Sequence, residues 1–191
     1  MFDKLYNVIS KTTYLDQKDK DLCSTFFEPV TFKRNDIIEV ENKIPQNLYF
    51  INEGYLRLFY YDDNGDEITT QLSSPESFIT SFLSYINQKK ATDNLECITD
   101  CDLLRISRPK MLELIAASET FKNFSLIIFQ EAITTTQSRA NDLATLTAEI
   151  KYKKLLNEQP QLIQNIPLQY IASYLGIKPQ SLSRIRNLLN K

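Results

Sequence analysis

The chain of 191 residues contains no histidine, and it has only three cysteines and three glycines. Without histidine there is no Ser-His-Asp triad, no histidine-bound zinc and no haem held by a histidine ligand. The three cysteines, Cys23, Cys97 and Cys101, cannot supply the four thiolates of an ordinary iron–sulfur cluster. We therefore expect no metal, no cofactor and no catalytic residues, and hence a protein that is not an enzyme.

Three cysteines are also too few and too scattered for a disulfide framework. Cys97 and Cys101 could form a redox pair, although two small core residues on either side of a turn are the commoner arrangement. No apolar run approaches the ~18 residues of a membrane span. The start of the chain, MFDKLYNVISKTTYLDQ, lacks the basic head and apolar stretch of a signal peptide. We expect a cytoplasmic protein with no membrane partner.

The formal net charge of -2 conceals an uneven distribution of charge. Residues 151–191 hold seven basic residues and one acidic residue, which gives them a net charge of +6. The other 150 residues hold 15 basic and 23 acidic side chains and therefore carry −8. A basic end on an acidic body predicts a polyanion as a partner of the C-terminal part. A solvated basic surface is the plain alternative.

The first part of the chain changes from a helical pattern to a pattern of strands. About 25 residues look helical, with Leu5, Ile9 and Leu15 as apolar points. Short segments rich in β-branched and aromatic residues follow, at residues 30–34, 36–40, 47–51, 55–61, 67–72, 95–99 and 102–106. Asn64-Gly65 is a strong hairpin signal and Gly54 marks a second tight turn. These features predict a small β-sandwich or barrel.

A long helical pattern runs from about Glu119 to Asn157, after a short helix in the segment SRPKMLELIAAS. Its apolar positions recur mostly every three or four residues. They are Leu126, Phe129, Ile133, Ala140, Leu143 and Ile150. A helix of roughly 35 residues is longer than most globular helices and is difficult to bury in so small a protein. We interpret its apolar face as a homodimer interface, with an intramolecular core helix as the alternative.

The last twenty-four residues, LQYIASYLGIKPQSLSRIRNLLNK, predict two short helices joined by a tight turn. Pro167 and Pro179 fit the first turns of the two helices, and Gly176 supplies the left-handed residue between them. Seven positions fit the core of a helix-turn-helix: Ile171, Ala172, Leu175, Gly176, Ile177, Leu182 and Ile185. A plain helical hairpin that closes the core is the alternative.

The outward face of the second helix is polar and basic. It carries Lys178, Gln180, Ser181, Ser183, Arg184 and Arg186. Arginine can pair bidentately with guanine and glutamine with adenine, while serine and lysine more often hold the DNA backbone. The peptide N–H groups at the start of this helix also favour a phosphate. The segment therefore predicts double-stranded DNA as a partner.

A β-rich sensor, a long dimer helix and a C-terminal helix-turn-helix, in this order, resemble the Crp–Fnr transcription regulators. The most specific segments are IASYLGIKPQSLSRIR, EGYLRLFYYDDNGDE and TDCDLLRISRPKMLELI. The resemblance implies an α+β fold that works as a homodimer on palindromic DNA. Its parts would be an N-terminal double-stranded β-helix (jelly-roll) sensor barrel of the cyclic-nucleotide-binding type in residues 1–118, a dimerisation helix in residues 119–157, and a helix-turn-helix of winged-helix type, with a short or absent wing, in residues 158–191.

The resemblance also implies roles for single residues. Gln180 and Arg184 fall where family members reach base edges, and Lys178 and Ser181 fall where they contact phosphates. Pro179 stands where some members place a base-reading arginine, so we expect a different operator sequence. An activator would have RNA polymerase as a further partner, but these residues do not distinguish an activator from a repressor.

The effector is left open by the sequence. Family members that bind cyclic AMP carry a Phe-Gly-Glu stretch and a following Arg-Ser or Arg-Thr for the cyclic phosphate. The corresponding residues here are Phe78-Ile79-Thr80-Ser81 and Lys89-Lys90-Ala91-Thr92, which lack the glycine, the glutamate and the arginine. Because the guanidinium partner of the phosphate is missing, we do not expect cyclic AMP as the effector. The resemblance places Phe78, Thr80, Ser81, Thr135 and Thr136 at a ligand pocket, and a ligand-free regulator fits as well.

Two rival functions come from other classes. An enzyme on a double-stranded β-helix barrel, as in cupins, would need metal ligands, typically histidines, and the sequence has none. A small-ligand sensor that signals through protein partners would use the helical tail for docking. The basic tail and the seven matching positions favour DNA binding over this second rival.

Overall fold

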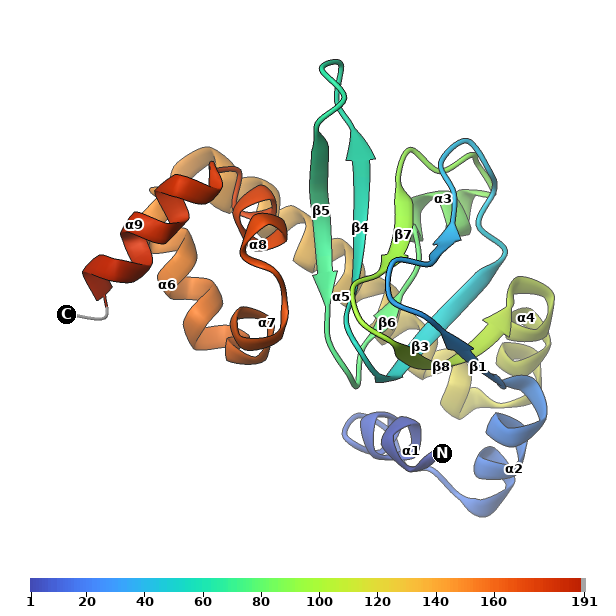
Figure 1. Cartoon of the computed structure of the whole chain (residues 1–191). Helices are drawn as coiled ribbons and strands as arrows, with labels where there is room; N and C mark the ends of the chain where they lie inside the picture. The colour runs from blue at the N-terminus through green and yellow to red at the C-terminus, as the bar shows by residue number, and fades with distance from the viewer. Residues whose placement is uncertain (190–191) are drawn as a thin grey trace.

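A computed structural model of the chain describes residues 1–189, which form an α+β fold (Figure 1). The helices are α1 (Asp3–Ser10), α2 (Gln17–Phe26), α3 (Phe82–Asn87), α4 (Arg108–Ala117), α5 (Glu119–Thr145), α6 (Ala148–Glu158), α7 (Pro160–Asn165), α8 (Leu168–Tyr174) and α9 (Pro179–Leu189). The strands are β1 (Glu28–Phe32), β2 (Ile37–Glu39), β3 (Asn47–Glu53), β4 (Leu56–Tyr61), β5 (Glu67–Ser73), β6 (Phe78–Ile79), β7 (Asn94–Cys97) and β8 (Cys101–Ser107).

The strands form two four-stranded sheets in which every pairing is antiparallel. One sheet has the order β1-β8-β3-β6 and the other has the order β2-β7-β4-β5. All seven predicted strands are present, while the two-residue strand β6 and the helix α3 were not predicted. β4 and β5 are neighbours in the chain and pair as a hairpin within one sheet, whereas every other step from one strand to the next passes from one sheet to the other.

Both predicted turns are present. The β4–β5 hairpin has Gly65 at φ +83, and the side chain of Asp62 accepts hydrogen bonds from the main-chain N–H groups of Asn64 and Asp66, both at 2.9 Å. Gly54 has φ +97, and a Cβ atom there would lie 2.5 Å from the sulfur of Cys101. Glycine is therefore required at position 54 both by conformation and by the close approach of β8.

The two sheets enclose one apolar core, to which both contribute, and Ile51, Leu58, Leu95 and Leu103 are among its buried members. Cys97 and Cys101, at the end of β7 and the start of β8, are buried in the same core as free thiols. This placement agrees with the expectation of small core residues on either side of a turn.

A second core lies between the β1-β8-β3-β6 sheet and helices α1, α2, α4 and α5. The predicted apolar points Leu5, Ile9 and Leu15 are all buried in it. The N-terminal helical segment is two helices rather than one, because the side chain of Asp16 caps α2 by accepting a hydrogen bond from the N–H of Asp19.

The predicted long helix is broken, and the expectation of one helix of roughly 35 residues was wrong. α5 ends at Thr145, Leu146 is extended at φ -99 and ψ 145, and α6 begins after Thr147. The hydroxyl of Thr147 accepts a hydrogen bond from the N–H of Ile150 at 3.3 Å, so it caps a new helix. Ile150 therefore lies on α6 and not on the same helix as the other five residues of the predicted dimer stripe.

Helices α6 to α9 share a third core, formed mainly by Tyr152, Leu155, Leu162, Ile171 and Leu182. We call this part, residues 148–189, the C-terminal unit. Leu72 of β5 and Ile98 after β7 belong to the same core, so the unit is packed against the strands rather than tethered beside them. Figure 1 shows α6 to α9 on one side of β5 and the remaining strands on its other side. Asn190 and Lys191, the last residues of the predicted DNA-binding domain, lie outside the described residues.

No helix within residues 1–189 is both long and apolar enough to cross a membrane.

Candidate nucleic-acid interface and ligand cavities

The turn between α8 and α9 is closed by main-chain hydrogen bonds. Gly176 has φ +67, and its N–H donates to the carbonyl of Ser173 at 3.0 Å. The N–H of Ile177 donates to the carbonyl of Ala172, also at 3.0 Å. A left-handed residue followed by this backward bond ends α8 in the manner of a glycine C-cap. The chain then re-enters a helix at Pro179, as predicted.

Six of the seven positions of the predicted helix-turn-helix core share one apolar core in the structure. Ile171, Ala172, Leu175 and Leu182 are buried, Ile177 and Ile185 are half-buried, and Gly176 lies exposed at the turn. Ala172 is fully buried where α8 and α9 approach, which requires a small side chain there.

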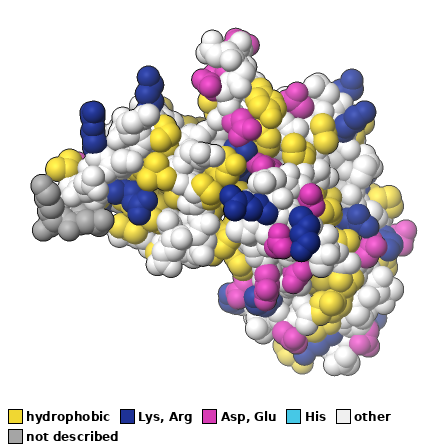
Figure 2. Space-filling model, viewed as in Figure 1, with side chains coloured by type: hydrophobic (Ala, Val, Ile, Leu, Met, Phe, Trp, Pro, Cys, Tyr) yellow, Lys and Arg dark blue, Asp and Glu magenta, His cyan; other side chains and the backbone are white. Residues whose placement is uncertain are grey.

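The opposite side of α9 faces solvent. Lys178, Gln180, Ser181, Ser183 and Arg184 are exposed, whereas Arg186 is half-buried. In Figure 2 the acidic side chains gather on the β4–β5 hairpin and on the lower part of the molecule, while lysine and arginine side chains stand out from the C-terminal unit. The C-terminal unit thus presents basic side chains and the Gln180 amide on α9. Few acidic side chains lie near this helix on the face drawn in Figure 2.

The apolar stripe of α5 is largely uncovered. Leu126 is 62% exposed and Ile133 is 54% exposed, Ala140 and Leu143 are also exposed, and Phe129 is half-buried. Phe129 packs edge-on against Phe82 of α3, while Leu126 and Ile133 stay largely uncovered. An exposed row of large apolar side chains on a long helix is typical of an interaction surface.

The predicted ligand-pocket residues are not all brought together. Phe78, Thr135 and Thr136 line a cavity of about 370 Å³ between α5 and the end of β5. Thr80 and Ser81 do not line it, because both are buried against Glu39 of β2. Thr80 and Ser81 thus lie apart from the cavity that the other three residues line, and the role of all five in ligand binding stays a prediction.

Glu39 accepts hydrogen bonds from the hydroxyl of Thr80 at 3.2 Å and from the N–H of Ser81 at 3.4 Å. Burial raises the pKa of Glu39 to about 8, although these two hydrogen bonds act in the opposite direction. The carboxyl of Asp93 also disfavours ionisation of Glu39. Sequence reasoning missed this group, since nothing in the segment DIIEV distinguishes a buried glutamate from an exposed one.

Arg57 of β4 joins the sheet to the C-terminal unit. Its side chain is buried and forms ion pairs with Glu67 and Glu96. Its guanidinium lies 4.1 Å from the ring centre of Phe59 and 3.8 Å from that of Tyr170 on α8. The sequence could have indicated a buried ion pair here, because Arg57 is the one charged residue in the otherwise apolar strand LRLFYY.

Ser173 and Arg139 complete the contact between β5 and α8. The hydroxyl of Ser173 accepts from the N–H of Thr69 at 2.8 Å and donates to the carbonyl of Glu67 at 3.0 Å. Arg139 Nη2 donates to the carbonyls of Thr69 and Tyr174, at 2.9 and 3.0 Å. Main-chain groups on the edge strand are thereby paired with side chains instead of water.

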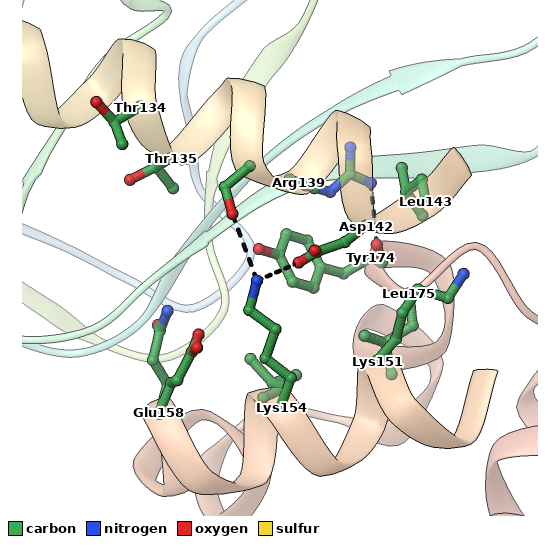
Figure 3. A pocket seen from close by; sticks show the side chains of 13 residues that line it. Thr134, Thr135, Arg139, Asp142, Leu143, Lys151, Lys154, Glu158, Tyr174 and Leu175 are labelled. Atoms are coloured by element: carbon green, nitrogen blue, oxygen red, sulfur yellow. Dashed lines mark hydrogen bonds and ion pairs between the residues drawn. The ribbon is translucent and has the colours of Figure 1, made fainter. Parts of the chain in front are cut away.

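A second cavity, of about 260 Å³, lies between α5, α6 and the end of α8 (Figure 3). Lys154 Nζ lies 2.6 Å from a carboxylate oxygen of Asp142 and 3.4 Å from the hydroxyl of Ser138. Arg139 and Lys151 also line this cavity, from α5 and α6. Sequence reasoning missed it because the break at Leu146 and Thr147 folds α6 back toward α5.

Comparison with known proteins matches residues 29–118 to the cyclic nucleotide-binding domain family. No curated protein matches the chain by sequence. Among solved structures, FixK2 from Bradyrhizobium japonicum is 13% identical with a TM-score of 0.77, over 86% of this chain and 84% of that chain. The c-di-GMP-responsive global regulator CLP of Xanthomonas campestris is 15% identical with a TM-score of 0.68, over 92% of each chain.

The catabolite activator protein of Thermus thermophilus is 20% identical with a TM-score of 0.56, over 96% of this chain and 86% of that chain. At such identities the likeness concerns the fold alone. Residues 29–118 thus match a cyclic nucleotide-binding domain, and the chain as a whole has an α+β fold similar to those of Crp–Fnr regulators.

Proposed function

We propose that the chain is a sequence-specific, DNA-binding transcription regulator of the Crp–Fnr type. The observation that carries this proposal is the second helix of the C-terminal unit. Leu182 anchors α9 in the core, while Gln180, Ser181 and Arg184 face solvent on its first two turns. A helix supported from behind and exposed at its N-terminal half is what a helix-turn-helix inserts into the major groove.

We assign base reading to Gln180 and Arg184 and phosphate contact to Lys178, Ser181 and Ser183. Arg186, which is partly buried, would contact the DNA backbone from the edge of the interface. Amide and guanidinium groups have the donor and acceptor geometry that distinguishes adenine and guanine edges. The net charge of +6 in residues 151–191 supports attraction to the DNA backbone.

A homodimer would form through the exposed stripe of α5. Leu126, Phe129, Ile133, Ala140 and Leu143 would pair with the same residues of a second copy. A two-fold axis along this helix would place two copies of α9 about one DNA turn apart, ~34 Å, on a palindromic site. Because α6 packs into the C-terminal unit, we place the boundary of the DNA-binding part at Leu146 and Thr147 rather than at residue 158. RNA polymerase would be a further partner of an activator.

We further propose that the effector, if the regulator has one, is not cyclic AMP. Thr80 and Ser81 stand where the resemblance expects nucleotide contacts, and both are held by the carboxyl group of Glu39. A cyclic phosphate at this place would meet an acidic group instead of a guanidinium, which disfavours binding. Lys89 and Lys90 are exposed and lie outside the cavity that Phe78 lines.

The test is selection of bound sequences from random duplex DNA by the purified full chain without added effector. We expect a palindrome with half-sites about ten base pairs apart. Arg184→Ala should then weaken binding to the selected site by about 1–3 kcal/mol and relax one base position. Lys122→Ala, which removes a cation from α5, is the matched control and should leave binding unchanged.

Equal losses on selected and random DNA would show that Arg184 does not read a base. Failure to enrich any sequence, with or without cell extract, would contradict the proposal and favour a sensor that signals through proteins.

A further inference from the structure

The guanidinium of Arg139 lies where α5, β5 and α8 meet, and its partners are all neutral. Nη2 donates to the main-chain carbonyls of Thr69 and Tyr174, and the ring centre of Tyr174 lies 4.8 Å from Cζ. Within residues 1–189, no carboxylate oxygen lies within 4.0 Å of this guanidinium. Arg139 therefore keeps its positive charge in a half-buried place without a negative partner.

One donor of Arg139 is also left without an acceptor. Its Nε atom is buried and has no hydrogen-bond partner among the described residues. Burial lowers the pKa of Arg139, because the charged form loses water and gains no carboxylate in return. Buried cations and buried N–H groups in proteins are normally paired. Because Nε is shielded from solvent, an anion in the neighbouring cavity would pair with the charge of the guanidinium and would not accept a hydrogen bond from Nε.

The cavity beside Arg139 has the right size and charge for such an acceptor. It has a volume of about 260 Å³, and Lys151 and Lys154 line it with Arg139. Lys154 is neutralised by Asp142 at 2.6 Å, and Glu158 adds a second negative charge near Lys154. Lys151, like Arg139, has no carboxylate within 4.0 Å in residues 1–189, so neither of them forms an ion pair. The three cations and two carboxylates that line the cavity give it a net charge of +1.

Hydroxyl groups complete the lining. Ser138 and Tyr174 contribute one each. Figure 3 shows the Tyr174 hydroxyl on the side of Lys154 and the Lys151 ammonium group on the opposite side, near Leu143, so the two lysines lie on different sides of the cavity. A guanidinium with an ammonium group and hydroxyl donors is the set of groups that binds phosphate and carboxylate oxygens in proteins. The volume lies just below the usual range of sites for drug-sized ligands, which favours a small ligand or the head group of a larger one.

We propose that this cavity, which we call the Arg139 site, binds a small oxyanion, with Arg139 and Lys151 as its charged donors. The site is separate from the DNA-binding face on α9. It adjoins the cavity that Phe78 lines, since Thr135, Arg139, Gln159 and Tyr174 line both. The proposal does not depend on DNA binding, since it concerns a pocket within one chain.

The experiment is a titration of the full chain with inorganic phosphate and, separately, with acetate, at constant ionic strength in chloride. Calorimetry gives the dissociation constant, and the unfolding temperature gives an independent reading of binding. We expect saturable binding of at least one anion. Tighter binding of phosphate would indicate a natural ligand with a phosphate group, and tighter binding of acetate would indicate a carboxylate. Arg139→Gln should weaken it at least tenfold, and Lys151→Gln several-fold.

Lys122→Gln is the matched control, because it removes a positive charge from the same helix, away from the cavity. It should bind the anion as the unsubstituted protein does. Should Arg139→Gln fail to fold, because Arg139 also bridges β5 and α8, Lys151→Gln decides the question. The proposal is overturned if neither anion binds saturably, or if Lys151→Gln binds as tightly as Lys122→Gln.

Discussion

The carboxyl group of Glu39 lies at the end of β2, where the fold supplies it with hydrogen bonds but not with a compensating positive charge. Thr80 and Ser81 donate to it, while Asp93 lies close enough to disfavour its ionised form. Burial also raises the pKa of Asp93, to which Ser81 donates as well. We therefore expect the region around these two acids, within residues 29–118, to respond to pH.

Glu39→Gln should therefore change stability in a pH-dependent way. The pKa of Glu39 rises from 4.5 to about 8 on folding, so the folded state binds the proton more tightly than the unfolded state. The free energy of unfolding must then fall as pH rises from 4.5 toward 8, by at most ~1.4 kcal/mol per pH unit for this group. The raised pKa of Asp93 acts in the same direction.

We expect Glu39→Gln to be more stable than the unsubstituted chain at pH 9 and no more stable at pH 5, as measured by urea unfolding at both pH values. Glu113→Gln, at an exposed position on α4, is the control and should show no such change with pH. A difference between the two proteins that is the same at pH 5 and pH 9 would show that Glu39 does not titrate in this range.

At the scale of elements, the turn between α8 and α9 depends on one glycine. Gly176 combines φ +67 with a close neighbour, since a Cβ atom there would lie 3.1 Å from Cδ2 of Leu143 on α5. Gly65 in the β4–β5 hairpin has φ +83 but open space around it. A side chain at position 65 would cost backbone strain alone, whereas a side chain at position 176 would cost both backbone strain and a steric contact.

Gly176→Ala should lower the free energy of unfolding by more than Gly65→Ala. Each change places a side chain in the left-handed region at a cost of about 1–2 kcal/mol, and only the first also displaces Leu143. Chemical denaturation of both variants measures the difference. If Gly65→Ala costs as much, then the contact with Leu143 contributes nothing to the position of the turn.

For the whole molecule, the break between α5 and α6 decides which surfaces are available to a second copy. The exposed apolar stripe of α5 stops at Leu143, and α6 turns back to join the core of the C-terminal unit. Ile150 is 49% exposed on α6, nearly as much as Ile133 on α5 at 54%. A dimer that forms through α5 alone would bury Ile133 and leave Ile150 exposed.

Ile133→Glu should convert the proposed dimer to a monomer, because a charge in an apolar interface must be desolvated. Ile150→Glu, with similar exposure, should leave the dimer intact. Sedimentation equilibrium measures both association constants. A dimer that survives Ile133→Glu contradicts the assignment of the interface to α5, and dissociation by both variants would extend the interface to α6.

Local patterns predicted most of the elements. The seven strand segments, the hairpin at Gly65 and the two C-terminal helices around Gly176 all depend on residues next to one another in the chain, because β-branched content, left-handed glycines and helix-starting prolines act over a few residues. The match of residues 29–118 to the cyclic nucleotide-binding domain family agrees with the predicted sensor. The dimer interface and the DNA contacts remain predictions.

The sequence by itself therefore determined the order of the elements, the charge of the C-terminal end and the absence of histidine chemistry. Only the tertiary structure decided which distant side chains meet: Glu39 with Thr80 and Ser81, Arg57 with Tyr170, and Arg139 with Thr69 and Tyr174. It also decided the helix break, where Thr147 caps α6 and Tyr152 and Leu155 of α6 enter the core of the C-terminal unit. The contacts of Glu39, Arg57 and Arg139 join residues thirty-five or more positions apart in the chain, about which local propensity carries no information.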